Sequence, residues 1–175
     1  ITLFDGTGTD YDAVLKVVAR SAVTVDVGAG RPAERESPLA VTLLQGVSRG
    51  ARMDTVVQKA TELGVRRLQP VLTGRSVVRL DAERAQARLE HWQRIVISAC
   101  EQCGRNRIPE VRMISPLDVW LAAEENDAQR WVLLPGADTA LRDLPRPQKP
   151  VELLVGPEGG LTGAIFADQA VNFTR

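Results

Sequence analysis

The stretch from Val151 to Gly160, Val-Glu-Leu-Leu-Val-Gly-Pro-Glu-Gly-Gly, constrains the fold more than any other part of the chain. Its first five residues are mostly apolar and favour β-structure, which is typical of a strand buried on both faces of a parallel sheet. A glycine-rich turn follows, and the sequence from Thr162 to Val171 has a helical pattern with Thr162 as a candidate N-cap. This order predicts bare backbone N–H groups at the carboxyl end of a sheet, where open α/β folds bind ligands. A tight turn without a ligand is the alternative.

Strand and helix patterns alternate from Pro38 onward, which predicts an α/β fold with a mostly parallel sheet covered on both faces. Asp81 is the expected N-cap of a long helix, and Gly64 and Gly104 follow the ends of two helices. The expected strands are Leu39–Leu44, Val65–Leu72, Val111–Ile114, Trp131–Leu134 and Val151–Val155, and the expected helices are Met53–Leu63, Asp81–Cys103 and Pro116–Glu125.

The segment before Pro38 has a different, β-rich character. Ile1–Phe4, Tyr11–Val18 and Ala22–Val27 are candidate strands, and the turn-rich run between Phe4 and Tyr11 predicts a hairpin connection. Gly28–Ser37 contains glycine, proline and charged residues and is predicted to be a linker. Because about 30 residues do not close a stable β domain alone, we expect either an appendage to the larger unit or a domain that begins before Ile1.

Composition sets broad limits on the class of protein. With 175 residues, 44% of them hydrophobic, the chain can form one sizeable core, or one core and a small added module. No apolar run is long enough to span a bilayer, and Ile1 begins directly in strand-like sequence without a signal-type segment. We therefore expect a cytoplasmic protein that does not contact membranes.

The residue types that support most catalytic sites are scarce. Cys100 and Cys103 form a C-x-x-C pattern, but the chain has no other cysteine and His91 is its one histidine. Two small side chains one helical turn apart are therefore a better interpretation than a redox or zinc site, and no metal is expected. Nucleotide-binding glycine fingerprints, the nucleophile elbow and the zinc-protease motif are all absent from the sequence.

Basic residues concentrate in the middle of a chain whose formal net charge is zero. Between Arg49 and Arg112 there are 13 basic and 7 acidic residues, whereas acidic residues predominate on either side. Such asymmetry indicates a polyanionic partner, although a solvated helix face explains part of it. The arginines in or beside predicted loops carry more of this signal: they are Arg75, Arg79, Arg105, Arg107 and Arg112.

Four segments of the chain together resemble the RsmE family, the bacterial methyltransferases of the SPOUT superfamily that modify N3 of a uridine in 16S ribosomal RNA. The turn from Phe4 to Tyr11 also resembles the end of the PUA-like β-barrel of that family. The match covers nearly the whole chain, and the motifs occur in the family's order. The four segments are Met53–Val65, Thr73–Val77, Glu101–Pro109 and Leu154–Leu161.

The resemblance implies a SPOUT-type methyltransferase domain with a trefoil knot, one of the rare exceptions to unknotted chains, preceded by part of a small PUA-like β-barrel. We expect residues 1–37 to belong to the barrel, with an RNA-binding role, and residues 38–175 to the methyltransferase domain. S-adenosylmethionine would bind in the knot, at a site completed by the second subunit of a homodimer. The residues expected to hold this cofactor are Leu134, Pro135 and Gly136 on one wall, and Gly156, Pro157, Glu158, Gly159, Gly160 and Leu161 on the other.

A third family motif, Leu-Gly-x-x-x-Leu-Arg-x-Glu-Thr-Ala, follows the equivalent of Phe173-Thr174 and closes the knot. It does not occur in the 175 residues, and neither do the first strands of the PUA-like barrel. We expect both to lie outside this stretch of sequence.

Methylation of uridine N3 removes the imide proton and leaves negative charge on N3 and the two carbonyl oxygens. An arginine beside the base would stabilise that charge, and Arg105 and Arg75 are the candidate catalytic residues. Arg105 is equally suited to binding a phosphate. Gln102 and Asn106 are candidates to read the uracil edge, and a helix cap is the alternative role for Asn106. The expected RNA contacts are Arg49, Arg52, Arg75, Gln102, Arg105 and Arg107, with 16S ribosomal RNA in the assembled small subunit as the substrate.

Two other functions stay open at this point. A SPOUT enzyme can act elsewhere on RNA, for example at a ribose 2′-OH, although the segment Glu101–Pro109 speaks against it. An inactive RNA-binding module is the third hypothesis, and failure to bind S-adenosylmethionine would favour it.

Overall fold

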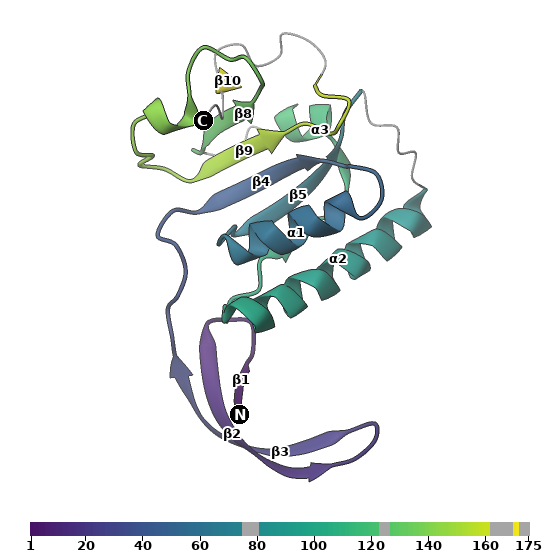
Figure 1. Ribbon diagram of the computed structural model, residues 1–175, viewed down its shortest axis with the longest axis vertical. Helices are drawn as coiled ribbons and strands as arrows, with labels where there is room; N and C mark the ends of the chain where they lie inside the picture. The colour runs from purple at the N-terminus through teal and green to yellow at the C-terminus, as the bar shows by residue number, and fades with distance from the viewer. Residues whose placement is uncertain (75–80, 123–126, 162–169, 172–175) are drawn as a thin grey trace.

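The computed structural model describes residues 1–74, 81–122, 127–161 and 170–171 of the chain. Within them, two sheets are present, one of three strands and one of seven, and the helices lie against the larger sheet (Figure 1). The strands are Thr2–Phe4 (β1), Thr9–Val18 (β2), Val23–Pro32 (β3), Val41–Gly46 (β4), Arg67–Leu72 (β5), Glu110–Val111 (β6), Ser115–Pro116 (β7), Gln129–Leu133 (β8), Val151–Val155 (β9) and Ala170–Val171 (β10). The helices are Arg52–Glu62 (α1), Ala82–Cys103 (α2) and Leu117–Ala122 (α3), with a 3₁₀ turn at Leu141–Asp143.

The larger sheet is parallel throughout its described pairings, as the alternation of strand and helix patterns predicted. β4 lies at its centre and pairs with β5 on one side and β9 on the other, so that Val41 is opposite Val151 and Thr42 is opposite Arg67. β8 lies beside β9, and β10 lies beside β8. The carboxyl ends of β4, β5, β8 and β9 therefore meet at one edge of the sheet.

Each face of this sheet has its own hydrophobic cluster, because successive side chains of a strand point to opposite faces. Leu43 packs into the cluster formed with α1 and α2, whereas the next residue, Leu44, belongs to the cluster that includes Leu117 of α3. Figure 1 shows α1 and α2 side by side against the same face. The sheet is thus covered on both faces by helices, as its apolar strands require.

Local signals explain why α2 forms where it does. The Asp81 side chain accepts a hydrogen bond from the Arg84 backbone N–H at 2.8 Å, and Gly104 ends the helix with a φ of 77°, in the left-handed region that favours glycine. Leu89, Trp92 and Val96 are buried and lie on one side of the helix. The expected caps and the expected helix are confirmed.

A proline inside β5 coincides with a change of strand partner. Pro70 is fully buried and faces Gln45 of β4. On the other side, β5 pairs with β6 through Arg67 and Leu68, and with β7 only after Pro70. Because proline has no N–H to donate to a sheet, the gap between the two short partner strands falls at the position that lacks a donor.

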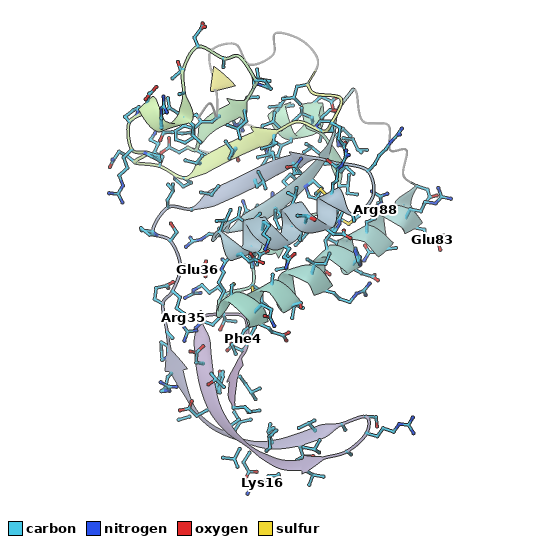
Figure 2. The ribbon with its side chains drawn as sticks, viewed as in Figure 1. Phe4, Lys16, Arg35, Glu36, Glu83 and Arg88 are labelled. Atoms are coloured by element: carbon cyan, nitrogen blue, oxygen red, sulfur yellow. The ribbon has the colours of Figure 1, made fainter. Side chains whose placement is uncertain are left out.

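The smaller sheet is antiparallel, with the order β1-β2-β3. The side chain of Asp5 accepts hydrogen bonds from the backbone and the hydroxyl of Thr7, which fixes the expected turn between β1 and β2. β2 and β3 form a curved ribbon that carries Lys16 well away from Glu83 and Arg88 of α2 (Figure 2).

Three expectations about element boundaries were wrong. The strand expected at Val111–Ile114 exists only at Val111, where β6 ends, and residues 112–114 belong to no strand. The predicted linker begins too early, because residues 28–32 continue β3 and pair with β2. The helix predicted to run to Val171 is contradicted at Ala170–Val171, which pair with β8 as a strand. The other residues of that predicted helix, and residues 123–126 of the helix expected at Pro116–Glu125, lie outside the described residues.

None of the helices in the described ranges is both long enough and apolar enough to cross a bilayer.

Leu68 and Leu63 offer a test of the core around α1 and α2. Leu68 has no exposed surface, whereas 86% of Leu63 is exposed. We expect Leu68→Ala to lower the free energy of unfolding by about 2–5 kcal/mol, because it removes buried methyl groups and leaves a cavity. The same change at Leu63 should cost less than about 0.5 kcal/mol. Urea unfolding measures both, and equal losses would contradict this assignment of the core.

Candidate functional site

The glycine-rich loop begins directly after β9, at the carboxyl edge of the larger sheet. Its turn is closed by a hydrogen bond of 2.8 Å from the Gly160 backbone N–H to the Pro157 carbonyl oxygen. Gly160 has a φ of 71°, which L-residues with side chains rarely adopt. Pro157 is buried, whereas Glu158 and Gly159 are exposed. The loop therefore presents the backbone of Gly159 to solvent, next to a buried proline.

Gly46, at the end of β4, is in contact with this loop. A Cβ atom at position 46 would lie 2.4 Å from Cδ of Pro157 and 2.5 Å from its backbone nitrogen, closer than real Cβ contacts allow. The Gln45 side chain donates to the Gly46 carbonyl oxygen at 3.0 Å. Only glycine fits this close approach of two backbones. Its position after an apolar strand was a usable signal, although Gly46 was not among the predicted site residues.

The predicted second wall lies next to the loop. Leu133 pairs with Val155, so Leu134 and Gly156 leave adjacent strands at the same edge. Leu134 and Leu161 both pack against the cluster of Leu44, Val71, Leu117, Val132 and Leu154. Gly136 has a φ of 82°, which lets the chain turn directly after Leu134. The structure thus brings the two expected cofactor-binding segments together.

Glu158 connects the loop to the segment between β4 and α1. Its Oε1 accepts a hydrogen bond from Arg52 Nη1 at 2.8 Å and a long one, 3.4 Å, from the backbone N–H of Arg49. Its own backbone N–H and the Arg52 guanidinium lower the pKa of the Glu158 carboxyl, so the group is ionised at neutral pH. Arg49 and Arg52, two of the expected RNA contacts, are therefore beside the glycine loop.

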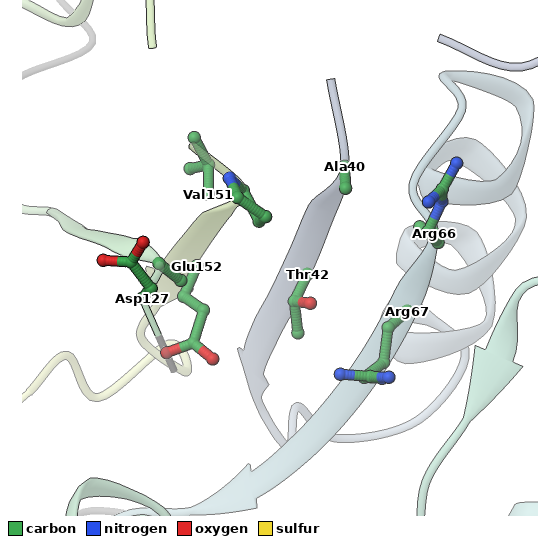
Figure 3. A pocket seen from close by; sticks show the side chains of 9 residues that line it. Ala40, Thr42, Arg66, Arg67, Asp127, Val151 and Glu152 are labelled. Carbon is green, nitrogen blue, oxygen red and sulfur yellow. The ribbon is translucent and has the colours of Figure 1, made fainter. Parts of the chain in front are cut away.

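A separate pocket of about 280 Å³ lies at the opposite edge of the sheet. Ala40 and Pro150, which precede β4 and β9, line it together with Thr42, Arg67 and Glu152 (Figure 3). This pocket opens at the amino ends of the strands, whereas open α/β sheets bind ligands at the carboxyl ends. The edge with the glycine loop is therefore the better candidate site.

Arg105, expected to act in catalysis or to bind RNA, is instead held inside the protein. Only 7% of it is exposed, and its Nη1 donates to the carbonyl oxygens of Thr61 at 2.7 Å and Val65 at 3.1 Å. Its Nε donates to Glu36 Oε1 at 2.9 Å, and its Nη2 pairs with the other oxygen of Glu36. These partners engage all three nitrogens of the guanidinium and leave little of it exposed.

Arg105 is also at the wrong end of the sheet for chemistry at the glycine loop. Its partner Val65 precedes β5, whereas the loop lies at the end where β5 finishes. A six-residue strand spans about 20 Å, so the structure does not bring Arg105 and the loop together within one chain. The positions of the motifs in the sequence did not indicate this separation. It arises because α2 runs back along the sheet and carries Arg105 to the opposite edge.

The remaining predicted residues are distributed over both edges. Gln102 is exposed in the last turn of α2. Arg107 is exposed, and its guanidinium lies against Gly8, with one hydrogen bond of 3.4 Å to Glu34. Asn106 is 1% exposed and donates inward, so it does not read a base edge. Thr73 and Gly74 follow β5 at the loop edge, and Arg75 lies outside the described residues.

The two cysteines are free, and they differ in burial. Cys100 is buried, its thiol contacts the Arg107 carbonyl oxygen at 3.8 Å, and burial raises its pKa to about 11. Cys103 is exposed. Across the described ranges, no group of three or more His, Cys, Asp or Glu residues is arranged to hold a metal ion.

Neighbouring arginines test the structural role of Arg105. Replacing it by methionine leaves the Glu36 carboxylate buried without its partner, so we expect Arg105→Met to lower the free energy of unfolding by about 3–5 kcal/mol. Arg107→Met removes a side chain that is 46% exposed. We expect it to change the free energy of unfolding by no more than about 0.5 kcal/mol. Chemical denaturation separates the two, and a stable Arg105→Met protein would show that the ion pair is dispensable.

Comparison with known proteins adds relatives to this geometry. Residues 35–165 match the family described as RNA methyltransferase domain. Ribosomal RNA small subunit methyltransferase E of Buchnera aphidicola (Schizaphis graminum) is 34% identical over 127 residues, or 73% of this chain and 52% of the relative. The protein of that name from Bacillus subtilis is 29% identical over 167 residues, which are 90% of this chain and 64% of the relative. The chain thus spans about half of the first relative and 64% of the second.

Solved structures agree with these matches. Ribosomal RNA small subunit methyltransferase E from Neisseria gonorrhoeae, bound to S-adenosyl methionine, has a TM-score of 0.91 and 40% identity, covering 100% of this chain and 75% of that protein. A putative methyltransferase from Legionella pneumophila, also with bound cofactor SAM, has a TM-score of 0.86 and 33% identity. The match covers 99% of this chain and 74% of that protein. The α/β fold, the glycine-rich edge of its parallel sheet and these relatives lead to one assignment: the chain belongs to the RsmE family of RNA methyltransferase domains.

Proposed function

We propose that this chain forms part of an S-adenosylmethionine-dependent methyltransferase that modifies N3 of a uridine in 16S ribosomal RNA. The observation that supports this most is the convergence of Gly46, the 156–161 loop and the 134–136 turn at one sheet edge. The motifs of the chain resemble those of uridine-N3 methyltransferases, and two solved relatives hold S-adenosylmethionine.

The residues at this edge fit such a cofactor. The close contact between Gly46 and Pro157 leaves no room for a side chain at position 46, and Gly136 and Gly160 have backbone conformations that favour glycine. A flat, polar ligand would then meet backbone N–H and carbonyl groups. Leu134 and Leu161, which pack on one cluster, would provide apolar contact. We assign cofactor binding to Leu134–Gly136 and Gly156–Leu161.

When bound, S-adenosylmethionine supplies a methyl group on a positively charged sulfonium. The ionised Glu158 carboxylate on the same loop complements that charge, while its ion pair with Arg52 holds a guanidinium at the mouth of the site. Arg49 and Arg52 are thereby suited to bind the phosphates of an RNA that enters here. Because both are also exposed, they can meet RNA without rearrangement of the core.

The target base loses its imide proton during the reaction, and the negative charge then spreads over N3 and two carbonyl oxygens. A cation at this edge lowers the energy of that state. Arg75 follows Thr73 and Gly74 at the carboxyl end of β5 and is our candidate for this role. N3 lies on the Watson–Crick edge, so the target uridine must be unpaired or flipped out of its helix.

The wider organisation belongs to the same proposal. Residues 1–37 would be part of a PUA-like β-barrel that binds RNA, and residues 38–175 the SPOUT methyltransferase domain with its trefoil knot. Gln102 and Arg107 are suited to contact RNA near the junction of the two units, because both are exposed. We also propose a homodimer that acts in the cytoplasm on the assembled small subunit.

The experiment that tests the reaction uses small ribosomal subunits that lack N3-methyluridine, together with S-adenosylmethionine. A methyl group on N3 blocks base pairing, so reverse transcription should stop at one new uridine. Absence of a stop despite cofactor binding would replace the proposal with another target, such as a ribose 2′-OH. Absence of both would favour an RNA-binding module.

Two glycine variants test the cofactor site. Gly46→Ala forces the 156–161 loop away from β4, and Gly159→Val adds a branched side chain to the exposed turn. We expect each to weaken S-adenosylmethionine binding about tenfold or more, measured by calorimetry. Leu63→Ala is the control, because that side chain is 86% exposed. Normal affinity in both variants would exclude this loop as the pocket.

A further inference from the structure

The three-stranded sheet meets the rest of the molecule through a mainly polar junction. Phe4 is its one residue among the side chains that pack against the larger core in the described ranges. Interfaces of this kind leave two units free to move unless other contacts hold them. Apolar contact is also non-directional, so the orientation of this sheet must depend on its hydrogen bonds and ion pairs.

Those contacts converge on five residues after α2, residues 104–108, which we call the junction segment. Its backbone joins the turn between β1 and β2: the Gly8 N–H donates to the Asn106 carbonyl oxygen at 3.0 Å, and the Ile108 N–H donates to the Gly6 carbonyl oxygen at 3.1 Å. Thr7 and Arg107 form an isolated antiparallel bridge between these bonds. The junction segment thus lies along the turn like a short extra strand.

Asn106 is the centre of the side-chain contacts. It is 1% exposed, and its Nδ2 donates to Asp10 Oδ1 at 3.0 Å and to the Ala33 carbonyl oxygen at 2.8 Å. Asp10 is the second residue of β2, and Ala33 follows β3, so one amide group holds both strands at their inner ends. A buried amide with fixed partners constrains direction as well as distance.

Asp10 extends the network to the connection between the sheets. It is 4% exposed and pairs with the Arg35 guanidinium, whose Nη1 also donates to the Gly104 carbonyl oxygen at 3.1 Å. Arg35 and Asn106 lower the pKa of the Asp10 carboxyl, which keeps it ionised at neutral pH. The next residue of the connection is Glu36 (Figure 2), and its pair with Arg105, described above, fixes it to α1 and to the turn before β5.

We infer that Asn106 and Asp10 are positioning residues for the methylation reaction, which hold the N-terminal sheet in one orientation relative to the glycine-loop edge. An RNA substrate that contacts both units binds well only if the two surfaces keep a fixed orientation relative to each other. Loss of that orientation weakens RNA binding but leaves the cofactor loop intact, because the network of Asn106 and Asp10 lies at the other edge of the larger sheet. This inference rests on the proposed function.

The test measures kinetics in the full chain with Asn106→Ala and Asp10→Asn. Each removes contacts of the buried network, and we expect the KM for small ribosomal subunits to rise about tenfold, while kcat and the affinity for S-adenosylmethionine stay within about twofold. Asp12→Asn is the matched control. It makes the same change two residues along β2, in an exposed pair with Arg31, and should leave all three values unchanged.

A distance measurement separates orientation from folding. Spin labels at Lys16→Cys and Glu83→Cys, in a Cys103→Ser background, report the relation of β2 to α2. We expect a narrow distance distribution in the parent and a broad one in Asn106→Ala. The double variant Asp10→Asn with Asn106→Asp exchanges the two groups and restores one donor and one acceptor across the pair. We expect it to narrow the distance distribution again in part and to lower the KM part of the way to the parent value. If Asn106→Ala does not fold, Arg35→Met replaces it, because that side chain is 47% exposed.

Three results would overturn the inference: unchanged distances in both single variants, an unchanged KM despite broadened distances, or a fall in kcat and cofactor affinity equal to the rise in KM. The distances need no substrate. Failure of the parent protein to methylate any RNA would therefore remove the proposed function, while the distances would still decide whether Asn106 and Asp10 orient the sheet.

Discussion

The pairing of β4 with both β5 and β9 is the constraint on which the rest of the structure depends. It joins Val41 to Val151, residues far apart in the sequence, through parallel hydrogen bonding that neither strand can form alone. Once this pairing exists, Gly46 must meet Pro157, and the turn after β8 must lie beside the loop after β9. The candidate site is therefore a consequence of sheet order. It needs no special side chain to assemble it.

Glycine serves two purposes at that edge, and the distinction explains the local sequence. At Gly160 and Gly136 it allows a left-handed backbone, whereas at Gly46 it allows two segments to approach more closely than a Cβ permits. Charged groups then surround this bare backbone from outside. Glu158 lies on the loop after β9 and Arg52 is the first residue of α1, so their ion pair also links that loop to the start of the helix.

Arginine residues in this chain divide into two groups that sequence alone does not separate. Arg105 and Arg107 are two positions apart in the same motif, yet one is enclosed by Glu36 and two carbonyl oxygens and the other is exposed. A guanidinium with its five donors suits both burial with fixed partners and contact with phosphate. Which role applies depends on the carbonyl and carboxylate groups nearby, and those come from α1, the turn before β5 and the segment before β4.

Local signals were sufficient for much of the fold. Asp81 and Gly104 delimited α2, the apolar run Val151–Val155 defined β9 to the residue, and the alternation of patterns indicated a parallel sheet. These features depend on neighbours within a few residues, so the sequence by itself determined them, together with the glycine loop as a candidate site. The continuation of β3 to Pro32 and the short strand at Ala170–Val171 depend on partner strands that local patterns do not reveal. Only the tertiary structure placed Arg105 and Asn106 inside the junction and Gly46 against Pro157, because burial and close approach are set by segments that meet through folding.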